Sequence, residues 1–330
     1  EDALAQFMAR RAPGTGKLTT KRREPDTVHF QSGILNGRTT GAPLAILIQN
    51  TNQHSGDYNG LTDTVRPSHA DFTAAVKYAG FADMRGGGHF SGRLTAPLCA
   101  AGGIALQILA QQGIAVGAQL LEAGGVRGRA FDPIAVSEDD FALVRTHTLP
   151  TLDASAVSPM ESAIDAARCE ADSVGGIIQA AAIGVPQGLG SPMADGIENR
   201  LARALFSIPG CKGVDFGSGF EASAMRGSLH NDPFTADESG NIRTVSNHAG
   251  GILGGIADGM PIILRCAMKP TPSIAMEQRT VSLLRKENTT LSIVGRHDPC
   301  IAIRAVPVVE AVMAFTLLDL LLEEGYYEKP

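Results

Sequence analysis

The chain has 330 residues, 44% of them hydrophobic and 19% charged, which is the composition of a globular protein and excludes a disordered or collagen-like one. Its formal net charge of −6 argues against a nucleic-acid partner, since such proteins present a basic surface. Five scattered cysteines without a CxxC pair argue against a disulfide framework and favour a reducing compartment, which we expect to be the cytoplasm.

The first half of the chain predicts short helices and strands in turn. The first dozen residues have the pattern of an amphipathic helix, and residues 27–50 predict a strand, a turn and a second strand. A helical segment is expected over residues 70–79. The stretch 95–113 predicts a longer helix, with Thr95 as its N-cap and Gly113 at its end.

The second half continues this mixture. A strand is expected over 114–121, and Ser158 with the proline after it predicts the start of a helix. The segments "VGGIIQAAAIGVPQGLG" and "KGVDFGSGFEASAMRG" are strand-like, with a helix between them in "MADGIENRLARALFSIP". The most apolar stretch, 305–322, contains Glu310 and Asp319, so we interpret it as a buried helix and expect no membrane span.

The strands are short and follow one another as hairpins, without regular crossover helices between them. This pattern favours an α+β fold with antiparallel sheets over a doubly wound fold. A chain of this length buries roughly 75% of its unfolded surface, so one large core is possible. No repeat, low-complexity segment or linker divides the sequence, and we expect a single compact domain over residues 1–330.

Glycines and cations are the chemically informative residues. The 38 glycines gather in "RGGGHFSG", "GVPQGLG", "GSGF" and "NHAGGILGGIADG". The first cluster precedes the helix predicted from Thr95, where peptide N–H groups attract anions, although a tight hairpin is the alternative for any one cluster. Cations without an intervening acid gather near the N-terminus and fit either a small anionic ligand or a solvated basic face. They are Arg10, Arg11, Lys17, Lys21, Arg22 and Arg23.

The segment "KPTPS" (269–273) is a candidate phosphate-binding loop. Its prolines fix the backbone outside a helix and hold Lys269, Thr271 and Ser273 ready for an anion, although a plain surface loop explains the same residues. Neither GxxxxGK[ST] nor a strand-linked GxGxxG occurs, so no ATP-binding loop or Rossmann fingerprint is predicted.

The segment "GRHDPC" (295–300) places Arg296, His297 and Asp298 directly before the long apolar helix. A carboxylate beside a guanidinium is usually a structural ion pair, but the histidine in the same loop favours proton transfer. The histidines lack the HxH and HxxxH spacings of metal sites, so we expect no bound metal.

These strings together resemble the chorismate synthase family over nearly the whole chain, in the order and spacing of that family. They are "RRAPGTGKLTTKRREPD", "RPSHADFT", "RGGGHFSGR", "GVPQGLGSPMADGIENRLARALFSIPGCKGVDFGSGF", "GSLHNDPF", "NHAGGILGGIADGMPI", "KPTPSI" and "GRHDPCIAIRAVPVVEA". The resemblance implies a lyase that converts 5-enolpyruvylshikimate 3-phosphate to chorismate and phosphate by anti 1,4-elimination with reduced FMN, in the shikimate pathway. It also implies helices packed between antiparallel sheets, and a homotetramer with its FMN sites near subunit contacts.

The resemblance implies roles for individual residues. His69 matches a histidine thought to set the protonation of the reduced flavin, and Asp298 matches an acid thought to relay a proton at flavin N5. The FMN-binding positions correspond to His89, Phe90, Ser91, Pro209, Gly210, Gly254, Lys269, Pro270, Thr271, Pro272, Ser273 and Arg296. The candidates for substrate or NADP phosphate are Arg11, Lys17, Arg23 and Arg93.

The sequence also departs from the family pattern. Members begin with a strand that carries T-x-G-E-S-H-G, and the present sequence starts beyond that motif. Arg-Ser-Ser is usual where His89, Phe90 and Ser91 stand, and arginine where Lys17 stands, and lysine does not form a bidentate contact. The alternative is therefore a truncated form that binds flavin and substrate but is catalytically impaired. Since no dinucleotide fingerprint occurs, we expect the flavin to be reduced elsewhere and not by NADPH on this chain.

Overall fold

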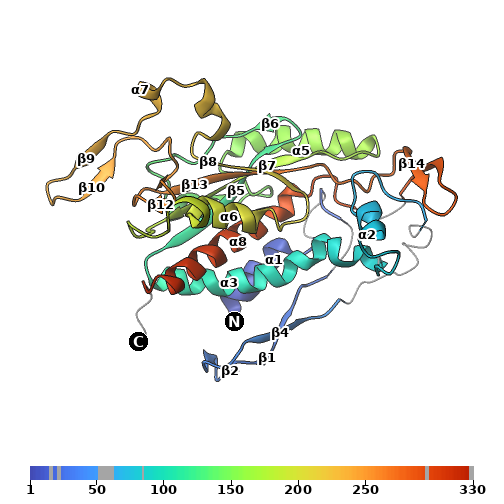
Figure 1. Cartoon of the computed structure of the whole chain (residues 1–330), viewed down its shortest axis with the longest axis horizontal. Coiled ribbons are helices and arrows are strands. Elements are labelled where there is room, and N and C mark those ends of the chain that lie inside the picture. Colours follow the sequence, from blue (N-terminus) through green and yellow to red (C-terminus); the bar gives the residue numbers. More distant parts are fainter. Residues whose placement is uncertain (15–17, 21–23, 51–62, 84, 294–296, 327–330) are drawn as a thin grey trace.

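A five-stranded antiparallel sheet lies at the centre of the fold (Figure 1). The structure is a computed structural model that describes the whole chain except residues 15–17, 21–23, 51–62, 84, 294–296 and 327–330. Each neighbouring pair of strands is antiparallel, which confirms the predicted α+β fold. In spatial order the strands are β6 (Val126–Arg127), β5 (Ala115–Ala123), β7 (Gly176–Ile183), β13 (Ile262–Met268) and β8 (Cys211–Phe216).

The middle of the sheet is covered on both faces, which explains why its strands are rich in Ala, Val, Ile and Leu. One face packs against α8 (Ala302–Glu323), and α4 (Glu138–Val144) packs against β5 on the other. Gly117 of β5 is required for this second contact, since a Cβ there would lie 2.2 Å from the Phe141 ring. The helix α5 (Ala154–Cys169) runs along β5 and β6.

A layer of helices lies below the sheet in Figure 1, with the hairpin of β1 and β4 beneath it. α8 is central and contacts the other helices of the layer as well as the sheet. By length and composition α8 is apolar enough to cross a membrane, but 78% of its most apolar window is buried in the fold, as the buried-helix interpretation predicts. The other helices of this layer are α1 (Asp2–Arg11), α3 (Thr95–Gln111) and α6 (Ile197–Leu205), and the hairpin beneath it consists of β1 (Val28–Ser32) and β4 (Ala45–Ile48).

A buried ion pair ties α1 to α8. The carboxylate of Glu310 is fully buried, and both of its oxygens accept from the Arg10 guanidinium, at 3.0 and 2.6 Å. Arg145 donates to the same carboxylate at 2.9 Å. Burial lowers the pKa of Arg10, but the charge and hydrogen bonds of Glu310 outweigh burial and raise it. The last turn of α1 is therefore anchored directly beside Arg11.

Shorter helices and strands lie around these layers. They are α2 (Asp71–Lys77), α7 (Gly227–His230), β2 (Ile34–Leu35), β3 (Arg38–Thr39), β9 (Phe234–Ala236), β10 (Ile242–Thr244), β11 (Ile252–Leu253), β12 (Ile256–Ala257), β14 (Gln278–Ser282) and β15 (Glu287–Leu291). Short segments of 3-10 helix occur at 85–90, 92–94, 193–195 and 219–224. The glycine cluster "RGGGHF" thus forms a 3-10 turn and not the hairpin that was its alternative.

α3 begins at Thr95, as the sequence predicts, but its cap differs, and α5 begins earlier than predicted. Thr95 is not the N-cap of α3: a 3-10 turn precedes it, capped by Ser91, whose hydroxyl accepts from the amide of Arg93. α5 begins at Ala154, because Asp153 accepts from the Ser155 amide and caps the helix one turn before Ser158. In these two places Ser91 and Asp153, and not Thr95 and Ser158, therefore accept the capping hydrogen bonds.

Candidate active site

A cavity of about 500 Å³ opens where the ends of several elements meet. The end of α1, the starts of α3 and α8, and the chain leaving α6 and β13 all reach it. Its lining comes chiefly from the segments 66–70, 89–95, 206–211, 268–273 and 297–308. Since α3 and α8 both present their N-termini here, their helix dipoles favour an anion in the cavity.

The cavity brings together most of the site residues predicted from the sequence. Those that line it are Arg11, His69, His89, Phe90, Ser91, Arg93, Pro209, Gly210, Lys269, Pro270, Thr271, Pro272, Ser273 and Asp298. Lys17, Arg23 and Arg296 lie outside the residues that the structure describes. Gly254 lies in the two-residue turn between β11 and β12 and is not part of this lining.

The conformation of the β11–β12 turn explains why glycine stands at 254. Gly254 and Gly255 have φ of +63° and +90°, the left-handed region in which a side chain is strained. A Cβ on Gly254 would meet nothing within 4 Å, so its surroundings in this chain do not exclude a side chain. Because Gly254 does not line the cavity, a single copy of this chain does not bring it into contact with a ligand bound there.

Arg11 is buried at the cavity wall and already has protein partners. Its Nη1 donates to the Asp26 carboxylate at 2.5 Å, and its Nε donates to the Thr95 hydroxyl at 3.1 Å. Its Nη2 donates to the Gly92 carbonyl at 3.0 Å. Only part of its donor set is left for a ligand, so Arg11 chiefly connects α1 to the start of α3.

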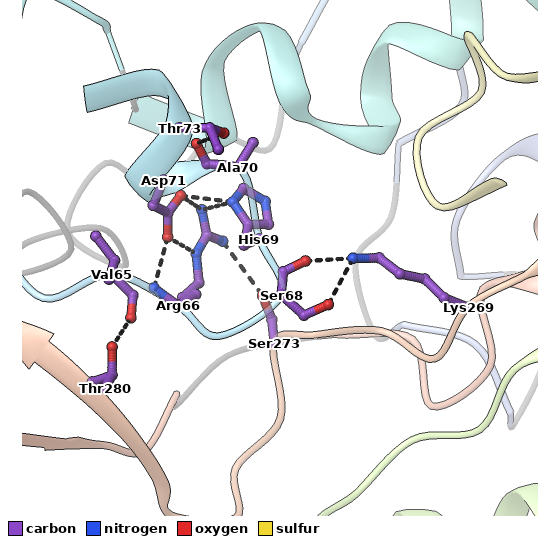
Figure 2. A network of polar contacts seen from close by, with 10 residues as sticks. All are labelled: Val65, Arg66, Ser68, His69, Ala70, Asp71, Thr73, Lys269, Ser273 and Thr280. Atoms are coloured by element: carbon purple, nitrogen blue, oxygen red, sulfur yellow. Dashed lines mark hydrogen bonds and ion pairs between the residues drawn. The ribbon is translucent and has the colours of Figure 1, made fainter. Parts of the chain in front are cut away.

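His69 belongs to a buried network with Arg66 and Asp71, drawn in Figure 2. The His69 Nδ1 lies 2.6 Å from Asp71 Oδ1. Arg66 donates to both carboxylate oxygens of Asp71, from Nε and Nη2, each at 2.7 Å. Burial raises the pKa of the Asp71 carboxyl, but the hydrogen bonds from Arg66 and His69 outweigh burial and hold it well below its ordinary range.

Lys269 joins the proline-bracketed loop to the segment that carries His69 (Figure 2). Its Nζ donates to the Ser68 carbonyl, and to the Ser68 hydroxyl at 3.1 Å. Ser68 has a φ of +59°, in the left-handed region. Burial, and then the charge of Lys212, lower the pKa of the Lys269 ammonium.

Asp298 forms an ion pair with a helix residue. Its Oδ2 accepts from Arg304 Nη1 at 2.8 Å, and its Oδ1 accepts from the Thr20 amide at 2.8 Å. Arg304 also donates from Nε to the Arg11 carbonyl at 3.1 Å. Of the two interpretations that the sequence left open for this loop, these contacts match the structural ion pair, with Arg304 as the partner.

Sequence reasoning did not assign roles to Arg66, Asp71, Ser68 or Arg304. The first two stand within five residues of each other around His69 in "RPSHAD", and that spacing of opposite charges beside a histidine is the signal that could have found them. Arg304 lies on α8, beyond the loop 295–300 that contains Asp298, and no local pattern of residues indicates its role. Among the described residues there is no group of His, Cys, Asp and Glu that could hold a metal ion.

Known proteins resemble this chain along almost its whole length. The sequence profile described as chorismate synthase matches residues 1–322. The chorismate synthase of Korarchaeum cryptofilum is 47% identical over 97% of this chain and 87% of its own length, and that of Dehalococcoides mccartyi strain BAV1 is 46% identical over 98% and 88%. A crystal structure of chorismate synthase superposes with a TM-score of 0.75 at 27% identity, covering 98% of this chain and 84% of the other.

The family model and the curated relatives identify the chain as an enzyme of the lyase class. The chain belongs to the chorismate synthase family.

Proposed function

We propose that this chain converts 5-enolpyruvylshikimate 3-phosphate to chorismate and phosphate by anti 1,4-elimination, with reduced FMN bound in the cavity. The observation that carries the proposal is the convergence on one cavity of His69, Lys269 and most of the flavin-binding positions of the family. The substrate bears a phosphate and two carboxylates, and each charge-assisted hydrogen bond to such groups contributes about 1.5–3 kcal/mol.

The lining suits a flavin mononucleotide as well as the substrate. About 500 Å³ falls within the roughly 300–1,000 Å³ of ligand pockets. Phe90, Ile208 and Ile301 supply apolar surface for a ring system, and Lys269 supplies a cation for a phosphate. Gly210 lines the cavity with φ of +94°, a conformation that favours glycine. Reduced FMN would supply electrons to the reacting ring and recover them, so that the overall reaction has no net redox change.

The residues of this chain have distinct tasks under this proposal. Lys269 and the N-termini of α3 and α8 hold the anionic groups, and the apolar wall excludes water. His69 holds a proton beside the cavity and exchanges it as charge develops. Asp298, through Arg304 and Thr20, fixes the loop before α8 against the segment after α1. A direct proton relay by Asp298 requires its release from Arg304.

We further infer that the chain acts as a single domain in the cytoplasm and assembles as a homotetramer, without membrane or nucleic acid. One hydrophobic core that runs from Leu4 to Leu321 supports the single domain. The position of Gly254 outside the cavity supports an assembly in which a neighbouring subunit brings this turn to the flavin. No dinucleotide fingerprint occurs in the sequence, which supports reduction of FMN outside this chain.

Anaerobic incubation of the 330-residue chain with 5-enolpyruvylshikimate 3-phosphate and photoreduced FMN tests the proposal. We expect release of phosphate and chorismate in equal amounts, dependent on the reduced flavin. The His69→Ala variant is expected to turn over about 10²–10⁴-fold more slowly, because it lacks the positioned acid or base. Binding of flavin without release of phosphate would favour the catalytically impaired form. The absence of both flavin binding and phosphate release would refute the proposal.

A further inference from the structure

The ring of His69 is held in one orientation by buried charges. The exposed fractions of the side chains are 14% for His69, 4% for Asp71 and 5% for Arg66. Asp71 also accepts from the Arg66 amide at 3.0 Å, so its carboxylate is fixed by both the backbone and the side chain of Arg66. In a site this buried, such bonds determine where the imidazole nitrogens point.

The contacts decide which nitrogen of His69 carries the proton in the neutral ring. Despite burial, the hydrogen bonds and charge of Arg66 hold the pKa of Asp71 low and keep it ionised at neutral pH, so it only accepts hydrogen bonds. Its approach to 2.6 Å of Nδ1 therefore requires a proton on Nδ1. Arg66 Nη2, 3.1 Å from Nδ1, would favour the opposite tautomer, but a charge-assisted bond to a carboxylate is the stronger contact.

We propose that Asp71, held by Arg66, is a positioning residue for His69: it keeps Nδ1 protonated and turns Nε2 towards the cavity as the nitrogen that exchanges a proton. This inference rests on the proposed elimination reaction. In Figure 2 the second ring nitrogen, Nε2, lies on the side of the His69 ring away from Asp71. His69 is one of the residues that line the cavity. Asp71 also stabilises the imidazolium when His69 is protonated, as the orienting carboxylate of a catalytic triad does.

A double-mutant cycle separates positioning from mere structural support. In Asp71→Asn, one carboxylate oxygen is replaced by an amide NH₂, which either faces Arg66 or donates to Nδ1 and reverses the tautomer of His69. We expect kcat to fall by about 10²–10⁴-fold and its pH dependence to change, while KM changes little. In the His69→Ala background, Asp71→Asn should change kcat by less than about twofold.

A matched control exists outside the cavity. Asp215 and Arg265 form the same two-bond pair, at 2.9 and 2.8 Å, and neither residue lines the cavity. Asp215→Asn should keep kcat within about twofold of the wild-type chain, since sites far from the chemistry act independently. Equal losses from Asp71→Asn with and without His69 would overturn the inference, because they would assign Asp71 a structural role only.

A direct measurement covers the case in which Asp71→Asn does not fold. Nitrogen-15 chemical shifts of His69 in the wild-type chain, assigned by comparison with His69→Ala, report the tautomer. We expect Nδ1 to be protonated and Nε2 to be unprotonated at high pH. A neutral ring with its proton on Nε2 would overturn the inference. The tautomer is read without turnover. An inactive wild-type chain with the expected tautomer would therefore refute the proposed function but not the positioning of His69 by Asp71.

Discussion

Replacing Lys269 by methionine should weaken binding of FMN and leave the fold intact. Methionine keeps most of the length of the side chain but removes the ammonium that faces the cavity. One charge-assisted hydrogen bond contributes about 1.5–3 kcal/mol, which corresponds to a loss of affinity of about 10- to 150-fold. The bonds from Lys269 to Ser68 are lost as well, but Ser68 is exposed and water replaces them.

The same variant should change how FMN binding depends on pH. The pKa of Lys269 is lowered by burial and by Lys212, so its charge is lost at lower pH than for an ordinary lysine. The ammonium, which binds the anion, is present below that pKa. Affinity of the wild-type chain should therefore fall as pH rises into the alkaline range, and Lys269→Met should lack this fall.

Anaerobic titration of FMN followed by its absorbance measures both effects. Lys212→Met is the matched control, because it removes a neighbouring exposed charge that does not line the cavity. We expect it to retain affinity near neutral pH and to shift the alkaline loss to higher pH. If Lys269→Met binds FMN as tightly as the wild-type chain, or if the alkaline loss persists in it, the assignment of Lys269 to the flavin is wrong.

Two further variants test the packing that supports the site. Gly102→Ala places a Cβ 2.3 Å from that of Ala311, where α3 crosses α8. Urea unfolding should therefore report a free energy of unfolding lower by about 1–3 kcal/mol. Gly227→Ala is the control: a Cβ there meets open space, so its free energy of unfolding should be nearly unchanged. Glu310→Gln leaves the partly buried Arg10 without a counter-charge and should cost about 3 kcal/mol or somewhat more, seen as a lower urea midpoint; an unchanged midpoint would contradict the role given to this pair.

The amino-acid sequence alone determined the class of fold and predicted the kind of ligand. Apolar stretches such as 305–322 and short strands between glycines depend on neighbours a few residues away, and these patterns predicted the buried helix and the antiparallel sheets. Local clusters of glycine, cations and histidine predicted an anion site. The predicted cap at α3 and the predicted start of α5 were wrong, because Ser91 and Asp153 accept the capping hydrogen bonds, and which side chain does so is decided by the folded backbone.

Only the tertiary structure decided which charged groups neutralise one another. Lys269 reaches Ser68 across 201 residues of sequence, and Arg10 reaches Glu310 across 300. Arg11 pairs with Asp26, which leaves it few donors for another partner, although it stands in the same cation-rich segment as Arg10. Hydrogen bonds and ion pairs act over a few ångströms, so their partners are chosen by the packing of distant segments, and the pattern of residues along the chain does not contain that information.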